Sequence, residues 1–452
     1  MRLVSTIKRP KNSVFFFLIF GSLCASAQQN SPFSRFGLGD VIPAGNILNR
    51  AMGGVSAPYA DGQSINFINP ASYSKLNLVT FDLGLTIDNR TLKSAVPVDK
   101  YNAINFTPSY VLLGLPVSSK EQIRKKRQVA MVLGLRPVST INYSIVEGRK
   151  LEPGRIDSIA YLYEGNGGLN QAFVGLSKRW GNLSLGINAG YTFGRKETDT
   201  RTFILDTSAT PTYRSNSGSE TSFGGGFING GLMYEANLNK ATSLRFGFSG
   251  NLSQKLNAEQ SVNRETFFYD NNGNTIVLDT VFNQSGVKGT IDLPSSYTAG
   301  VMLNKKSEDK NGGTVDSRMF GVEYSTTKWA DYRFFNQNEN LVNSWQFKVG
   351  GQIIPKPFNA GYWNRVAYRA GFNFGKDYMV AQGNEYSTYT ITAGAGFPIR
   401  RWRAYDNQYT TINTTIEMGK RGNKSNNITE NFVRFSLGLN LSDIWFIKRR
   451  YD

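Results

Sequence analysis

From Leu78 onward, apolar and polar residues alternate in a series of short stretches. In the clearest stretch, 183–194, small or polar residues separate an apolar set at every second position, namely Leu183, Leu185, Ile187, Ala189, Tyr191 and Phe193. A period of two predicts a β-strand with one apolar face and does not fit a helix. The chain is therefore predicted to be all-β. The apolar faces contact either a second sheet or membrane lipid.

Fourteen stretches carry this pattern: 78–90, 102–117, 127–146, 168–180, 183–196, 219–238, 242–256, 294–304, 317–328, 343–354, 364–375, 385–400, 407–420 and 429–447. Short connections (181–182, 239–241) alternate with long ones (148–167, 197–218 and 257–293). Transmembrane barrels have short periplasmic turns and longer outer loops, so the pattern predicts an antiparallel barrel whose first strand runs outward. The third long connection contains strand-like sequence from Thr275 to Phe282 and is expected to project as a hairpin. The predicted strand count is 14, within two.

Residues 1–27 have the pattern of a secretory signal peptide. Four cations, Arg2, Lys8, Arg9 and Lys11, precede the apolar run 14–20, and small residues follow at 25–27. The run is shorter than the roughly 20 apolar residues of a membrane-spanning helix. Cys24, the only cysteine, lies within this signal. The exported chain is therefore expected to have no disulfide and no thiol chemistry.

Charge and composition narrow the classes of function. The net charge is +18, but the cations are dispersed, apart from clusters at 120–127 and 448–450. Dispersed cations favour contact with anionic lipid head groups over nucleic-acid binding. The sequence has no histidine, which excludes a Ser-His-Asp triad and most transition-metal sites. We therefore predict no enzyme activity, no cofactor, no metal site and no nucleic-acid partner.

Residues 28–77, before the first strand, do not alternate and are rich in Gly, Pro, Asn and Ser. They nevertheless contain more apolar residues than a solvated linker would have: Phe33, Phe36, Leu38, Ile42, Ile47, Leu48, Met52, Val55, Tyr59, Ile65, Phe67 and Ile68. Turn-forming pairs such as Asn69-Pro70 favour a compact fold. We predict that this segment is a hatch, or plug, inside the barrel.

Several motifs resemble the FadL-type outer-membrane transporters. The hatch of that family is similar to 50–55 (Arg-Ala-Met-Gly-Gly-Val), 60–61 (Ala-Asp) and 69–71 (Asn-Pro-Ala), and two of its strands are similar to 293–300 and 321–332. The order and spacing of these motifs agree over essentially the whole exported chain. The two ends, 31–39 and 445–452, resemble the Bacteroidetes branch, which also resembles a carrier barrel of type IX secretion.

The resemblance implies a 14-stranded barrel in the cell outer membrane, formed by residues 78–452. A hatch over 28–77, with Gly53, Gly54, Asn69, Pro70 and Ala71, would plug it. Family members take up long-chain fatty acids or other hydrophobic small molecules. They release their ligand by hatch movement, partly through a lateral opening. The family's ligand pocket is not matched residue for residue, so the identity of the ligand stays open.

The alternation also predicts which side chains face the lumen. On 407–420 and 429–447 the inward sets are Tyr409, Thr411, Asn413, Thr415 and Glu417, then Arg434, Ser436, Gly438 and Asn440. A charge on the lipid face costs about 2–4 kcal/mol at the midplane, so the lumen is also predicted to contain Asp82, Arg136, Arg245, Glu323, Lys348 and Arg369.

Two interpretations of these charges stay open. In the first, a lumenal network holds the plug through Asp82, Arg136, Glu323, Glu417 and Arg434. In the second, one of three cations, Arg245, Lys348 or Arg369, binds a ligand carboxylate while apolar hatch residues hold the ligand's tail.

The six tryptophans lie near predicted strand ends: Trp180, Trp329, Trp345, Trp363, Trp402 and Trp445. An interfacial girdle is the predicted role, because indole rings prefer the boundary between lipid and water. A stacking surface for a sugar is the alternative.

Two functions besides transport remain open. The chain could be a non-transporting subunit of an outer-membrane machine, such as type IX secretion or barrel assembly, with complex partners. It could also be a soluble secreted β-protein. For the transporter, the expected partners are outer-membrane lipid and a hydrophobic small molecule.

Overall fold

A computed structural model of the chain describes residues 31–95, 98–150, 158–205, 213–270, 272–308, 314–358, 361–381, 383–400 and 409–443. The predicted signal at 1–27, with Cys24, lies outside the described residues. So do Trp402, Trp445 and the basic cluster 448–450.

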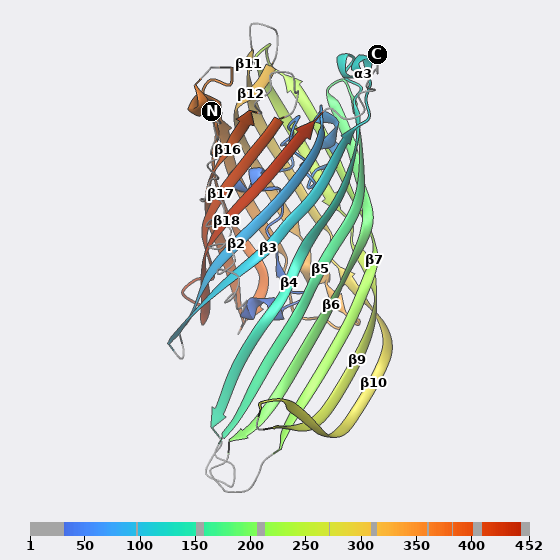
Figure 1. Ribbon diagram of the computed structural model, residues 1–452, viewed down its shortest axis with the longest axis vertical. Helices are drawn as coiled ribbons and strands as arrows, with labels where there is room; N and C mark the ends of the chain where they lie inside the picture. The colour runs from blue at the N-terminus through green and yellow to red at the C-terminus, as the bar shows by residue number, and fades with distance from the viewer. Residues whose placement is uncertain are drawn as a thin grey trace, which may run out of the picture.

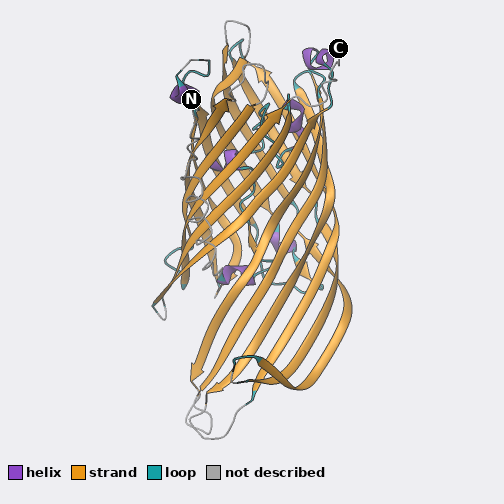
Figure 2. Cartoon of the chain, in the orientation of Figure 1, coloured by secondary structure: helices purple, strands orange, loops and turns teal. Residues whose placement is uncertain are grey.

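The strands form one closed antiparallel sheet (Figures 1 and 2). Apart from two short strands, β1 (Asp40–Val41) and β13 (Arg333–Phe334), they are β2 (Val79–Ser94), β3 (Asp99–Pro116), β4 (Val129–Lys150), β5 (Ser158–Trp180), β6 (Leu183–Leu205), β7 (Arg214–Asn237), β8 (Thr242–Asn251), β9 (Gln254–Tyr269), β10 (Thr275–Leu293), β11 (Ser296–Glu308), β12 (Thr314–Thr327), β14 (Ser344–Ile353), β15 (Ala367–Ala381), β16 (Asn384–Arg400), β17 (Tyr409–Arg421) and β18 (Ile428–Asp443). β18 pairs with β2 and closes the barrel.

Two barrel strands are interrupted. β8 and β9 both pair with β7 and continue each other across 252–253. β10 and β11 continue each other across 294–295, pairing with β9 and β8. Counted in this way, the barrel has the 14 strands that the alternation predicts.

The two faces of the wall differ as the alternation predicts. Leu437, Phe435 and Val433 on β18 are 39%, 44% and 47% exposed and point outward. Thr415 and Ser436 are completely buried on the inner side. An exposed apolar belt of this kind is typical of a barrel surrounded by hydrocarbon. No helix in the described part of the chain is long and apolar enough to cross a membrane.

The predicted long loops are largely strand. β5 begins at Ser158, β6 reaches Leu205 and β7 begins at Arg214, so 148–167 and 197–218 contribute mainly to the sheet. The region 257–293 is the predicted hairpin, formed by β9 and β10. These ladders continue past the apolar belt, where apolar and polar residues no longer alternate regularly, so the period that marks a strand in the sequence is lost. We call the part of β4–β7, β9 and β10 beyond the belt the extension sheet (Figures 1 and 2). It comprises 141–150, 158–167, 196–205, 214–221, 260–269 and 275–287.

The opposite end of the barrel has tight turns, such as 181–182, and longer connections, 117–128 and 354–366. There the connection between β3 and β4 forms α3 (Lys120–Arg124), which begins with a capping box at Ser119 and Gln122. The other helices of the barrel region are short: η3 (Trp329–Asp331) and α4 (Tyr362–Arg365).

Residues 31–78, which we call the N-terminal segment, precede the barrel and lie within it (blue in Figure 1). The segment contains η1 (Pro32–Arg35), β1, α2 (Ile47–Ala51) and η2 (Pro70–Lys75). α2 packs against β16 and β17, and η2 packs against β5, β6 and β7. Ile47, Met52 and Ile65 have no exposed surface. The apolar residues of the segment are therefore buried inside the barrel wall.

Glycines on the inner wall allow the segment to approach closely. A Cβ on Gly371 would lie 2.1 Å from the backbone nitrogen of Gly53, and one on Gly231 would lie 2.1 Å from Oδ1 of Asn69. Gly53 itself has a φ of 69°, which favours glycine. Small residues on both sides thus bring the segment into contact with the wall.

Candidate functional site

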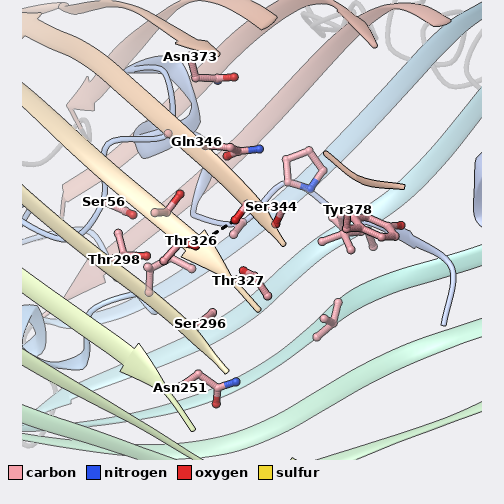
Figure 3. A pocket seen from close by; sticks show the side chains of 18 of the residues that line it. Ser56, Asn251, Ser296, Thr298, Thr326, Thr327, Ser344, Gln346, Asn373 and Tyr378 are labelled. Atoms are coloured by element: carbon pink, nitrogen blue, oxygen red, sulfur yellow. Dashed lines mark hydrogen bonds between the residues drawn. The ribbon is translucent and has the colours of Figure 1, made fainter. Parts of the chain in front are cut away.

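A cavity of about 430 Å³ lies between the N-terminal segment and the barrel wall. One side is polar and comes from β8, β11, β12, β14 and β15, with Asn251, Ser296, Thr298, Thr326, Thr327, Ser344, Gln346 and Asn373 (Figure 3). The lining also has an apolar set: Phe67, Ile68, Val138, Leu169, Phe173 and Phe227. A cavity with both kinds of surface suits a ligand with a polar and an apolar part.

The barrel wall beside this cavity is split between β3 and β4. The two strands pair only from Val111 opposite Leu135 to Pro116 opposite Ala130. Beyond this ladder each strand has a proline, Pro108 or Pro137, which has no N–H to donate. A register shift lies next to each proline. The strands diverge from there on (Figure 1), and we call this gap the β3–β4 seam.

The seam lies at the level of the apolar belt. Leu85 on β2 is the register partner of both Pro108 and Leu437, and Leu437 is one of the exposed belt residues. A seam at this level faces hydrocarbon if the barrel is in a membrane.

The N-terminal segment covers the seam from within. β1 pairs with β4, with Val41 opposite Ser139, and the Ile42 N–H donates to the Val138 carbonyl at 2.9 Å. Ile42 lines the lumenal cavity and also a groove of about 1070 Å³ that contains the outward-facing side chain of Phe193. Ile42 therefore separates the inner cavity from the outer groove.

A chain of buried ion pairs ties the segment to the wall. It links β2, β15, β17 and β18 to the segment in the order Asp377, Arg421, Asp40, Arg90, Asp88, Arg434, Glu417 and Arg50. Arg50 binds both oxygens of Glu417, at 2.8 and 2.9 Å. Burial raises the pKa of Asp40, but the charges of Arg421 and Arg90 more than offset this and hold that pKa well below its usual range.

Two further carboxylates hold other parts of the segment. Glu323 accepts hydrogen bonds from the backbone N–H groups of Ser56 and Ala57, both at 2.6 Å, and from Lys348 Nζ at 3.0 Å. Glu235 lies among four cations, Lys75, Arg179, Arg245 and Lys306. Burial and then the charge of Arg245 lower the pKa of Lys75 to about 7, against the opposing effect of Glu235.

The five residues predicted as one lumenal network face the lumen but do not form one network. Glu417 and Arg434 pair at 3.8 Å, whereas Glu323 pairs with Lys348. Asp82 accepts from the Ile65 N–H at 3.4 Å and has no cation within 4 Å among the described residues. The three carboxylates each accept hydrogen bonds from a different part of the N-terminal segment. Arg434 and Arg136 instead bond to wall residues, Asp88 and Gln171.

The three predicted ligand cations also face inward. Arg245 donates to the Ala60 carbonyl and to Asp316, both at 3.1 Å. Arg369 donates to Gln352 at 2.7 Å and to Asn413 at 2.9 Å. Of the three, Lys348 alone lines the lumenal cavity. Their role in ligand binding stays a prediction.

Arg136, which the alternation predicts only as a member of the charge network, differs from the other cations of the cavity. Among the described residues, Arg136 is the one cavity-lining cation without a carboxylate within 4 Å. Both Nε and Nη2 donate to Gln171 Oε1, at 3.2 and 2.9 Å, and the guanidinium lies 4.9 Å from the centre of the Phe67 ring. Its position directly before Pro137 puts it at the start of the seam.

The predicted hatch residues lie against the wall or the cavity. Gly53 and Gly54 line the cavity. Asn69 caps η2 and donates to the Ala57 carbonyl at 2.6 Å. Pro70 and Ala71 are buried. These contacts agree with a plug, whose movement stays a prediction.

One tryptophan departs from the predicted girdle. Trp329 lies in η3, which leads the chain from β12 back toward the lumen, and its ring stacks on Tyr378 at 4.5 Å and lines the cavity. Trp180 and Trp363 are 45% and 67% exposed, as side chains of a girdle would be.

Comparisons with solved structures show the fold. A FadL homologue of Pseudomonas aeruginosa is 10% identical, with a TM-score of 0.55 over 91% of this chain and 100% of its own. The toluene transporters TbuX of Ralstonia pickettii and TodX of Pseudomonas putida are each 14% identical, with TM-scores of 0.51 over 89% of this chain and 99% and 98% of theirs. At this identity the likeness concerns the fold alone.

The sequence itself gives a more specific result. No curated protein matches the chain. One protein family, BamG, matches residues 7–452, which is nearly the full length. The chain therefore belongs to the BamG family.

Proposed function

We propose that the protein is an outer-membrane channel for small hydrophobic or amphiphilic molecules, long-chain fatty acids among them. The N-terminal segment acts as its hatch, and the ligand passes between the lumenal cavity and the membrane through the β3–β4 seam. The observation that carries this proposal is the seam itself, where Ile42 separates the cavity from the outer groove.

Three other features support the proposal. The cavity is polar on one side and apolar on another, as an amphiphile requires. Beside the seam, Arg136 offers a carboxylate a guanidinium that no acidic side chain of the described residues occupies. The apolar belt and the predicted signal at 1–27 favour the outer membrane.

Uptake by liposomes containing the purified protein tests this function. A fluorescent long-chain fatty acid is the probe. Ile42→Gly should speed its passage because it removes the side chain that closes the seam, and Ile42→Trp should slow it. Ile416→Gly, an outward side chain on β17, is the matched control and should leave the rate unchanged. Equal rates in all four proteins would contradict the proposal.

A second candidate is a non-transporting subunit of an outer-membrane machine, such as one for barrel assembly. The ion pairs that fix the N-terminal segment at Asp40 and Arg50 favour this candidate, because loss of one partner of a buried pair costs about 3–5 kcal/mol. The family name, BamG, is in keeping with it.

Purification in a mild detergent separates the two candidates. A channel that works alone should elute without other proteins at equal amounts, and its Ile42 variants should differ in uptake. A machine subunit should elute with partners at constant stoichiometry and show no uptake that depends on Ile42.

A further inference from the structure

On β6 and β7, the inner face of the extension sheet carries neutral hydroxyl groups and one cation, Lys196, whereas the outer face carries the other charges. On β6 and β7, three cross-strand pairs of hydroxyl residues face inward: Thr198 with Ser219, Thr200 with Ser217 and Thr202 with Ser215. The residues between them on the outer face include Glu197, Asp199, Arg201 and Glu220. Successive strand residues point to opposite faces, so the same two strands separate hydroxyls from charges.

A cleft of about 280 Å³ opens on this inner face, separate from the lumenal cavity. Its floor comes from five strands, with Tyr143, Tyr163, Lys196, Thr198, Thr200, Ser219, Thr221 and Gln260. Arg35 of η1 and Phe334 of β13 complete the rim. Gln260 donates a hydrogen bond to Ser219 at 3.0 Å, which holds these two polar side chains together on the floor of the cleft.

Arg35 gives the cleft a positive charge that makes no ion pair with an acidic side chain of the described residues. Its guanidinium lies 4.5 Å from the centre of the Tyr163 ring, and among the described residues no carboxylate lies within 4 Å of it. A guanidinium stacked on an aromatic ring keeps its N–H groups at the edge of its plane, where they match a carboxylate. Lys196, the other cation, donates to the Gly37 carbonyl at 2.9 Å and lies 3.8 Å from Glu339.

We propose that this cleft binds an acidic carbohydrate. Threonine, serine and glutamine side chains both donate and accept hydrogen bonds, as the hydroxyls of a sugar ring do. The hydroxyls of Tyr143 and Tyr163, which also line the cleft, can donate and accept in the same way. Arg35 then binds the acidic group of the sugar. The site is independent of lipid transport through the lumen.

Titration calorimetry with the full-length protein in detergent tests the proposal. The probes are trigalacturonate, the neutral trisaccharide maltotriose and inorganic phosphate. Trigalacturonate should bind at least about tenfold more tightly than maltotriose, because maltotriose leaves Arg35 without a partner. Phosphate alone should not compete. Absence of trigalacturonate binding, or equal binding of phosphate alone, would overturn the proposal.

Variants at Arg35 of η1 and on the two faces of β6 make the test specific. Arg35→Gln should remove the preference for trigalacturonate, and Thr200→Val should weaken both sugars. Arg201→Gln, next to Thr200 but on the outer face, is the matched control. Circular dichroism and the thermal midpoint establish that each variant is folded. If Arg201→Gln lost as much affinity as Arg35→Gln, the binding would not be in the cleft.

Discussion

At the residue scale, neighbouring glycines on β7 test how the N-terminal segment meets the wall. A Cβ on Gly231 would lie 2.1 Å from Asn69 and 2.7 Å from Pro70, whereas one on Gly230 would meet nothing within 4 Å. Gly231→Ala should therefore expose the segment around Asn69 to added protease. Gly230→Ala should leave cleavage as in the wild type, because its methyl group points outward. Equal protection of both variants would show that the segment does not contact this wall.

The titration of Lys75 should make the stability of the folded protein depend on pH. Its pKa is lowered from 10.5 to about 7 in the folded protein. Between these values the unfolded chain binds a proton that the folded one does not, so stability rises with pH across this window. The thermal midpoint of the wild type should rise from pH 7 toward pH 10.

Lys75→Met removes this titration. Its thermal midpoint should rise less over the same range than that of the wild type. A wild-type midpoint that falls from pH 7 to 10, with Lys75→Met unchanged, would mean that the charged form of Lys75 is the one the fold prefers.

At the element scale, the strand segments that carry the apolar belt are the ones that the sequence predicts best. Lipid outside and polar groups inside impose a period of two, which β17 shows from Ile412 to Met418 and β18 from Val433 to Leu441. The extension sheet loses this signal because apolar residues such as Ile276, Val277 and Leu278 follow one another there instead of alternating with polar ones. The seam forms because Pro108 and Pro137 lie at the same level on adjacent strands. The sequence alone does not show this, because it does not give the register between β3 and β4.

The candidate site was less accessible to sequence reasoning. Alternation indicates that Glu417 faces inward but not what it binds. Its partner, Arg50, is 367 residues away in the chain. Trp329 lines the cavity and does not lie in the predicted girdle. The reason is that η3 turns inward at a position where a strand end would point the indole ring to the interface.

The extension hairpin should be dispensable for the barrel. The β9–β10 ladder beyond Val262 and its register partner Gln284 lies outside the apolar belt. Replacing 263–283 by a short turn should leave a barrel that keeps its β-sheet circular dichroism. Failure of the shortened chain to fold in detergent, where the wild type folds, would mean that the hairpin is part of the barrel's own stability.

At the scale of the whole molecule, the Arg50–Glu417 pair joins the segment to the closing strands. Arg50→Met should destabilise the protein by about 3–5 kcal/mol because Glu417 remains buried without this partner. Arg50→Met combined with Glu417→Met should be less destabilised than Arg50→Met alone. Denaturant unfolding in detergent measures both. Additive losses in the double variant would indicate that the two residues act independently.

The central claim is a plugged barrel whose wall parts at the β3–β4 seam, with Ile42 behind the gap. Single cysteines in a Cys24→Ser background, each carrying a fluorophore, test it in liposomes that contain lipid with a nitroxide in its acyl chain. A label at Ile42 should be quenched nearly as strongly as one at Leu437 on the belt, while a label at Thr298 in the lumenal cavity should not be. A label at Ile42 that is as unquenched as the one at Thr298 would contradict the account.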